Sequence, residues 1–107
     1  SEGVIDFHGS ADLWARRSRA FNPRLGLRCR IKSHKKDLSL KIWEAEVVAD
    51  QSATEPGAIL RADHQGLWIS CESGVLNIVS LQFDGKKRLD WSQFKSGLTL
   101  EPNDRFA

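Results

Sequence analysis

Closely spaced turn signals follow Pro23, and they limit the second part of the chain to short extended segments. Glycine and polar residues recur at Ser73–Gly74 and at Asp84–Gly85, and the loop from Gln51 to Gly57 contains Pro56. Strands joined by turns this short usually pair in antiparallel fashion. We therefore expect five mostly antiparallel strands, at residues 27–32, 38–48, 58–63, 66–72 and 74–83.

The first two of these segments indicate how the sheet should curve. Apolar and basic residues alternate from Leu27 to Lys32, which is the pattern of a strand with one buried and one exposed face. In the next segment the apolar positions change phase from Ile42 to Trp43, which predicts a β-bulge near Trp43–Glu44. Long, bent strands of this kind close small barrels.

A helix is expected before the strands. Ser10 is a suitable N-cap, and Asp12 places a negative charge in the first turn, where the helix dipole favours it. Pro23 must end the helix because it pushes Asn22 out of helical geometry. The apolar stripe of this helix consists of Ala11, Trp14, Ala15, Ser18 and Phe21. A second, short helix is expected within residues 89–97, and the tail after residue 100 is expected to be frayed.

Together these segments predict a mainly β fold. The expected architecture is a small antiparallel five-stranded Greek-key barrel of the OB type, with an N-terminal helix and a short C-terminal helix. A length of 107 residues suits one compact domain, so residues 1–107 should form a single domain. The chain contains no methionine, so we expect it to be a piece of a longer protein.

Charge is distributed unevenly along the chain. The formal net charge is only +2, but ten of the sixteen basic residues lie between Arg16 and Lys41. Asp37 is the sole acidic residue in that span. Such an asymmetry predicts one positive face and an anionic partner.

Other side chains give less specific indications. Trp14 and Trp43 fall on apolar stripes and are expected in the core, whereas Trp68 is a candidate for base stacking, with packing as the alternative. Cys29 and Cys71 are expected to be small buried hydrophobes in a reducing compartment; a disulfide or a redox role is the alternative. The three histidines are scattered, so neither a metal site nor a nucleophilic catalytic motif is expected.

No segment has the character of a membrane span or a secretory signal. No apolar run approaches the roughly 20 residues that cross a bilayer, and the first residues lack a basic start and a long apolar centre. We therefore expect a soluble intracellular protein without membrane contact, located in a bacterial cytoplasm or, as an alternative, in an organelle matrix. We also expect a monomer.

Several motifs occur in a fixed order along the chain. They are VIDF, SADLW and RAFNPRLGL, followed by KIWEAEVV, EPGAIL and GLWISCESGVLNIVSLQFDGKKRLDWSQFKSG. As a set they resemble the C-terminal domain family of methionyl-tRNA formyltransferases, and the resemblance covers about nine-tenths of the chain. The chain departs from the family pattern at Ser18, where an aliphatic residue is usual, and at Arg24 and Leu25, where tryptophan and proline are usual.

This resemblance implies a tRNA-holding module of a longer enzyme. That enzyme would transfer a formyl group from its co-substrate 10-formyltetrahydrofolate to methionine on initiator tRNA. The family's catalytic residues lie in its N-terminal domain, so no catalytic residue, metal or cofactor is assigned to this chain. The implied partners are initiator Met-tRNA and the N-terminal catalytic domain of the same chain. The residues expected to contact the tRNA backbone are Arg16, Arg17, Arg19, Arg24, Arg28, Arg30, Lys32, Lys35, Lys36, Lys86, Lys87 and Arg88.

Plainer interpretations of these residues remain open. The cations from Arg28 to Lys32 could be an ordinary solvated strand face, and those from Lys86 to Arg88 a charged turn that keeps a sheet edge soluble. For the whole chain, the main alternative is an accessory domain of a sugar-nucleotide or folate-linked formyltransferase that does not bind RNA. A free-standing nucleic-acid-binding barrel is a third hypothesis.

Overall fold

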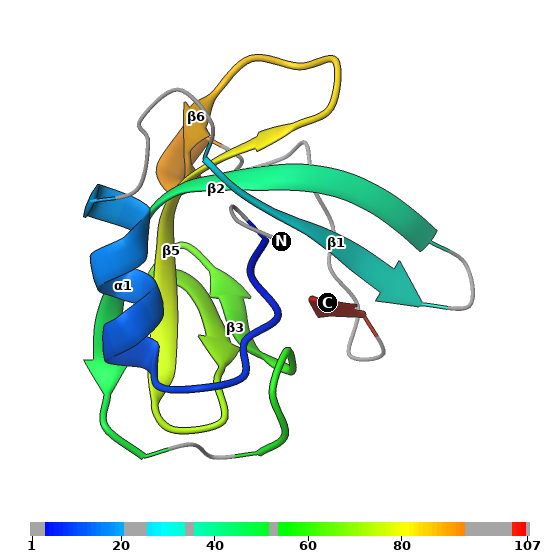
Figure 1. Cartoon of the computed structure of the whole chain (residues 1–107). Coiled ribbons are helices and arrows are strands. Elements are labelled where there is room, and N and C mark those ends of the chain that lie inside the picture. The colour runs from blue at the N-terminus through cyan, green and yellow to red at the C-terminus, as the bar shows by residue number, and fades with distance from the viewer. Residues whose placement is uncertain (1–3, 21–25, 34–35, 52–53, 94–103, 107) are drawn as a thin grey trace.

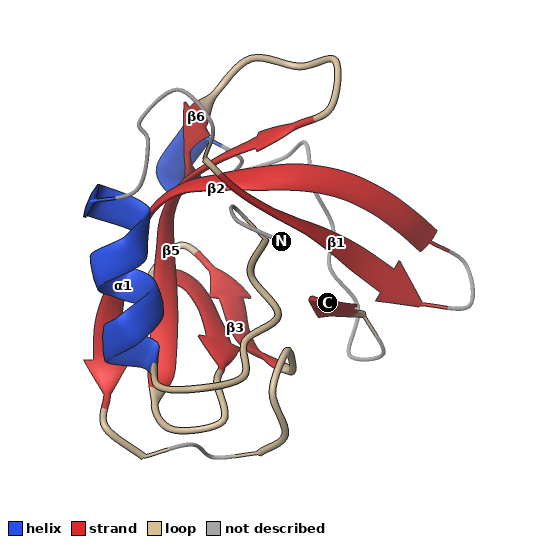
Figure 2. Cartoon of the chain, in the orientation of Figure 1, coloured by secondary structure: helices blue, strands red, loops and turns tan. Residues whose placement is uncertain are grey.

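A curled antiparallel sheet makes up most of the structure. The computed structural model describes residues 4–20, 26–33, 36–51, 54–93 and 104–106, except the side chains of Ala20 and Lys36. In this described part, one α-helix and seven strands are present, and all pairings between the strands are antiparallel (Figures 1 and 2). The elements are α1 (Ala11–Ala20), β1 (Leu27–Ser33), β2 (Lys36–Ala49), β3 (Ile59–Asp63), β4 (Gly66–Ser70), β5 (Val75–Phe83), β6 (Leu89–Asp90), the 3-10 turn η1 (Trp91–Gln93) and β7 (Arg105–Phe106).

The order of the strands confirms a mainly β fold. The sheet runs β3-β4-β5-β2-β1-β7, and β6 pairs with β5 beside this path. All five strands expected from the sequence are present, while β6 and β7, each two residues long, are additions to that set. Figure 1 shows α1 against one side of the curl and the β1–β2 hairpin extending away from it.

The short strand β7 connects the two edges of the sheet. It pairs with β1 on one side, and Arg105 forms a bridge to Ala58, next to β3, on the other. The Phe106 N–H donates a hydrogen bond to the Gly57 carbonyl at 2.8 Å, and the Phe106 ring packs edge-on against Phe7 with centroids 5.8 Å apart. The expectation of a frayed tail is therefore wrong for this strand, because burial of one aromatic ring holds it against the core.

Local hydrogen bonds explain where α1 begins and how it docks. The Ser10 hydroxyl accepts from the Leu13 N–H at 3.1 Å, which confirms the expected N-cap. Near the other end, the Ser18 hydroxyl donates to the Ala15 carbonyl at 2.8 Å and accepts from the Ala45 N–H at 3.1 Å. The polar side chain at position 18 thus joins the helix to β2, where an aliphatic residue could not do so.

The bulge predicted near Trp43–Glu44 is present in β2. Ile42 pairs with Leu81 and Glu44 pairs with Ser80, so Trp43 is the extra residue on its strand. The indole of Trp43 is only half-buried and lies outside the core cluster, so its expected core position is wrong. The reason is the bulge itself: the extra residue stays on the outer face while the strand changes phase around it.

The core lies inside the curl, between the sheet and α1. It includes Trp14 on the helix and also Ile5 and Phe7, which precede the helix in the chain. Cys29 and Cys71 are buried there as free thiols, as expected. Burial raises the pKa of both thiols, to about 12 for Cys71 and to a still higher value for Cys29, so both are protonated at neutral pH.

Two predictions about helices concern segments that the structure describes only in part. The stop at Asn22–Pro23, together with Phe21, lies outside the described residues. The described part of segment 89–97 forms β6 and the turn η1 instead of a regular helix, and the Trp91 indole donates to the Asp63 carbonyl at 2.8 Å. Within the described ranges, no helix combines the length and the apolar character that crossing a bilayer would require.

Gly57 should be essential for the docking of β7. A Cβ atom at this position would lie 2.1 Å from the Phe106 carbonyl oxygen, and the backbone has φ +89°. We expect Gly57→Ala to lower the free energy of unfolding by about 3 kcal/mol, since strain and lost packing combine. The control is Gly85→Ala, which has φ +78° but no atom within 4 Å of the new Cβ and should cost about 1 kcal/mol. Urea unfolding of both variants measures the difference, and equal losses would contradict this role of Gly57.

The buried thiols predict a loss of stability at high pH. Unfolded cysteines ionise near pH 8.5, whereas the native thiols have raised pKa values and keep their protons. Their contribution is therefore complete below about pH 8.5 and falls by up to about 1.4 kcal/mol per pH unit and thiol as the pH rises towards the native pKa. We would measure the free energy of unfolding at about pH 7.5 and at about pH 9.5. Between these pH values it should fall by about 1.4 kcal/mol more in the native chain than in Cys71→Ala. An identical pH dependence of the two proteins would contradict the burial of a protonated Cys71.

Candidate nucleic-acid interface

Strand β1 presents a row of cations on the outer face of the sheet. Arg28, Arg30 and Lys32 are exposed, while the residues between them are buried, so the predicted alternation is confirmed. In the pairing with β2, Lys41 lies opposite Arg28 and therefore on the same face. Arg30 is paired with the carboxylate of Asp37 at 2.9 Å.

Four side chains form a connected group on this face, which we call the Trp43 cluster: Lys41, Trp43, Gln82 and Arg88. The Lys41 ammonium lies 5.8 Å and the Arg88 guanidinium 5.2 Å from the centroid of the Trp43 ring. The Trp43 indole N–H donates to the Gln82 side-chain oxygen at 3.0 Å. The cluster thereby joins the motif KIWEAEVV on β2 to LQFDGKKR at the end of β5.

Backbone groups around the Trp43 cluster fix its position. The Gln82 amide donates to the Lys86 carbonyl at 2.8 Å, which ties the cluster to the turn after β5. The Arg88 Nε donates to the Ser80 hydroxyl at 2.8 Å. Gly26, at φ +65°, packs so closely that a Cβ there would lie 3.3 Å from Lys41 and 3.4 Å from the indole of Trp43. The residue before β1 therefore needs to be small.

Ion pairing separates the cations into two groups. Within the described residues, four arginines pair with carboxylates at 2.9–3.3 Å: Arg16 with Asp12, Arg30 with Asp37, Arg61 with Asp63, and Arg105 with Glu55. In the same ranges, no ion pair neutralises the cations of the β1–β2 face and the following turn, which are Arg28, Lys32, Lys41, Lys86, Lys87 and Arg88. Most of this unpaired charge lies in or beside the Trp43 cluster.

The helix cations occupy a separate element. Arg16, Arg17 and Arg19 are exposed on α1. Arg17 lies 5.1 Å from the Trp14 ring centroid, and Arg19 donates to the carbonyl of Ala45 on β2 at 3.5 Å. Arg19 thus reaches the sheet. Within the described part of the chain, neither contact joins the helix cations to the Trp43 cluster.

Part of the predicted set cannot be placed. Arg24 and Lys35 lie outside the described residues, and only the backbone of Lys36 is described, opposite Ser33 in the β1–β2 hairpin. Lys86 and Lys87 are exposed in the turn between β5 and β6. The structure therefore brings the β1 cations and Arg88 together around one face, through Lys41 and Trp43.

The Trp68 ring is less accessible to a stacking nucleic-acid base than the sequence pattern of its strand predicts. Its side chain is half-buried on β4, and the guanidinium of Arg61 lies over the ring at 4.8 Å from the centroid. Arg61 is itself held by Asp63 at 3.3 Å. The carboxylate's pKa is lowered, first by the hydrogen bond from the Gln65 N–H and also by the charge of Arg61. A stacked base would have to displace this arginine.

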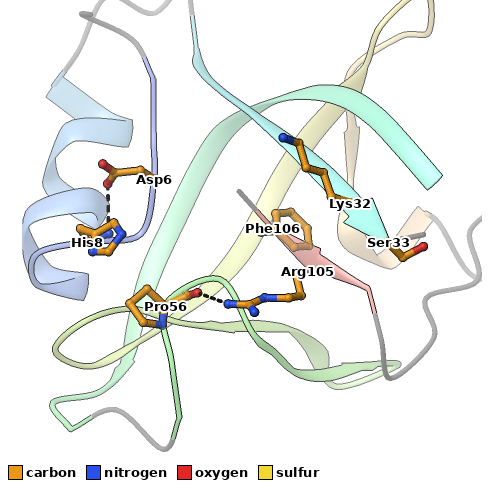
Figure 3. Close-up of a pocket in the computed structure, with 7 residues that line it drawn as sticks. All are labelled: Asp6, His8, Lys32, Ser33, Pro56, Arg105 and Phe106. Atoms are coloured by element: carbon orange, nitrogen blue, oxygen red, sulfur yellow. Dashed lines mark hydrogen bonds between the residues drawn. The ribbon is translucent and has the colours of Figure 1, made fainter. Parts of the chain in front are cut away.

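A pocket of about 490 Å³ lies at the far end of β1. Figure 3 shows its walls, made by the N-terminal segment, the end of β1, Pro56 and β7. Arg105 turns towards the Pro56 carbonyl, and Asp6 accepts from the His8 N–H, so several of the lining polar groups are already engaged. Among the described residues, no group of three or more histidine, cysteine, aspartate or glutamate side chains could hold a metal ion. The pocket offers mixed charge, in contrast to the unpaired cations of the outer face.

Sequence reasoning missed three members of the Trp43 cluster. Lys41 belongs to the basic span, but its place opposite Arg28 depends on strand register. The sequence places Trp43 in the core because the apolar positions change phase from Ile42 to Trp43, so that Trp43 counts as the first apolar residue of the new phase. Gln82 carried no recognisable signal, since its two hydrogen bonds depend on where β2 and the turn after β5 come to lie.

Comparisons with known proteins identify the family of this chain. The family model "Formyl transferase, C-terminal domain" matches residues 1–99. Methionyl-tRNA formyltransferase of Ralstonia pickettii (strain 12J) is 37% identical over 107 residues, covering 99% of this chain and 32% of that protein. The methionyl-tRNA formyltransferase of Methylobacillus flagellatus is 38% identical over 107 residues, covering 100% of this chain and 32% of that protein. The chain thus spans about a third of the length of these curated relatives. Because the family model matches nearly the whole chain, the chain belongs to the formyl transferase C-terminal domain family.

Proposed function

We propose that this chain is the tRNA-holding C-terminal domain of a methionyl-tRNA formyltransferase. Relatives that are 37–38% identical carry that name. The observation that carries the proposal is the set of unpaired cations on the β1–β2 face and the following turn. In the complete enzyme, a preceding domain would transfer formyl from 10-formyltetrahydrofolate to the methionyl amino group, while this domain holds initiator Met-tRNA.

The chemistry of the face suits a phosphate backbone. Lysine and arginine contacts to phosphates give affinity and orientation but do not read base sequence. A domain of this kind would increase the local concentration of tRNA and restrict its orientation, which favours reaction at a neighbouring site. Recognition of the particular tRNA would then belong mainly to the rest of the enzyme.

The finer architecture and setting are part of the same proposal. The meander β3-β4-β5, followed in space by the β2–β1 hairpin, is compatible with a permuted five-stranded Greek-key barrel of the OB type. Residues 1–107 would then be one binding domain of a longer cytoplasmic, monomeric enzyme whose catalytic domain is its partner within the same chain.

Salt-dependent binding of tRNA tests this function. We expect weak binding of the 107-residue chain to initiator and elongator tRNAs alike, measured by fluorescence anisotropy. With about four to six phosphate contacts, log affinity should fall against log salt with a slope between about −3 and −5. Binding that is absent at low salt, or independent of salt, would favour an accessory domain that does not touch RNA.

A matched pair of variants locates the binding face. Arg28→Gln removes an unpaired cation from β1 and should weaken the binding of all tRNAs, with a slope reduced by roughly 0.7–0.9. Arg61→Gln removes a cation that is paired with Asp63 and should leave the slope unchanged. Circular dichroism checks that both variants are folded. Equal effects of the two substitutions would contradict a binding face on β1.

A further inference from the structure

We infer that the Trp43 cluster is a fixed phosphate-binding anchor within the basic face: Lys41 and Arg88 bind neighbouring phosphates of one RNA strand, and Trp43 and Gln82 are positioning residues. This inference rests on the proposed function, which needs only a positive surface. It adds which side chains on that surface fix the RNA, and three of them lie outside the set expected from the sequence.

Both cations are held against the indole before RNA binds. Lys41 and Arg88 come from different parts of the sheet, yet both charged groups lie within 6 Å of the same indole centroid. The electron-rich ring face attracts each cation. Long basic side chains normally lose rotamer freedom when they bind a ligand, so side chains that are already held bind with a smaller entropic cost.

Arg88 is placed to bind a phosphate with two nitrogens. Its Nε is used in the bond to the Ser80 hydroxyl at 2.8 Å. Within the described residues, its two terminal nitrogens make no hydrogen bond, so they remain a fork of donors for a ligand. A planar fork of this kind matches two phosphate oxygens, whereas the Lys41 ammonium binds as a point charge.

Gln82 makes the anchor a single unit. Its oxygen accepts from the Trp43 indole N–H at 3.0 Å, and its amide donates to the Lys86 carbonyl at 2.8 Å. The turn is also closed by the bond from the Lys86 N–H to the Phe83 carbonyl at 3.0 Å. Ring, turn and Arg88 are therefore held in one arrangement.

The electrostatics of the cluster also favour a bound anion. Arg28 lies opposite Lys41 in the β1–β2 pairing, so a third cation adjoins the pair around Trp43. In the described ranges, no carboxylate forms an ion pair with any of the three, although the next cation on β1, Arg30, is neutralised by Asp37. Like charges gathered without a counter-ion repel one another, and a bound anion relieves that repulsion.

The indole itself is an unsuitable stacking platform. Trp43 is half-buried, Gly26 packs against it, and two cations lie over its ring. A base could reach the ring only by displacing those groups. The anchor should therefore bind backbone phosphates of a folded RNA and be indifferent to base sequence.

Charge-removing variants of the chain test the anchor against a diffuse surface. Lys41→Gln and Arg88→Gln should each weaken tRNA binding about tenfold, since each loses a charge-assisted contact, and each should reduce the salt slope by roughly 0.7–0.9. The matched comparison is Lys87→Gln, a cation of the same face and turn without a described side-chain contact; as part of the basic face but not of the anchor, it should weaken binding less, by about twofold. If Lys87→Gln and Arg88→Gln lose the same amount of tRNA affinity while the native chain still binds tRNA, the anchor is wrong but the proposed function stands. Failure of the native chain to bind tRNA would overturn the proposed function itself.

Two conservative variants test positioning separately from charge. Arg88→Lys keeps the charge but loses the fork and the Nε bond to Ser80, and Trp43→Phe keeps a ring but loses the N–H bond to Gln82. Both should weaken tRNA binding several-fold while leaving the salt slope unchanged, because the number of phosphate contacts stays the same. Thermal unfolding shows whether the Trp43→Phe variant is folded. If it is not, Arg88→Lys, a substitution at an exposed position, tests the anchor by itself. Unchanged affinity in folded Arg88→Lys would overturn the anchor.

Discussion

The bulge at Trp43 is the constraint on which the rest of the structure depends. β2 is the longest strand and pairs with both β1 and β5, so any change in its phase affects the whole sheet. One extra residue between Ile42 and Glu44 lets apolar residues on both sides of the bulge face the core. The extra side chain is left on the outer face, beside Lys41. The extra residue at Trp43, the first of three register shifts between β2 and β5, thus bends the sheet and also creates the centre of the Trp43 cluster.

The same irregularity connects the inner and outer parts of the fold. Just after the bulge, the Ala45 N–H is taken by the Ser18 hydroxyl of α1, which holds the helix against β2. On the other side of the sheet, Trp43 gathers Lys41, Gln82 and Arg88. Inner packing therefore fixes a surface that is rich in unpaired cations. In the proposed function, that fixed surface is what lets a small domain hold a large polyanion in one orientation.

Features encoded by neighbouring residues could be predicted from the sequence. The alternation from Leu27 to Lys32, the Ser10 cap and the bulge each follow from local pattern, and the structure confirms all three. β7 could not be predicted, because two residues carry no period and their pairing depends on Gly57 and Phe7, far away in the chain. The outward position of Trp43 was missed for a similar reason: a bulge predicts a change of phase but leaves open which residue is the extra one. The helix cations were grouped with those of β1 by sequence proximity, whereas the described contacts place them on a separate element.

Protection of individual lysines against chemical modification is the most direct test of the central claim, that unpaired cations around Trp43 hold the RNA. Lysines of the chain would be acetylated with and without saturating tRNA, and the modified positions quantified by mass spectrometry. The account predicts strong protection of Lys41, with less protection of Lys32, which lies at the far end of β1 beside the pocket. Full reactivity of Lys41 in the tRNA complex, with protection elsewhere on the chain, would contradict it.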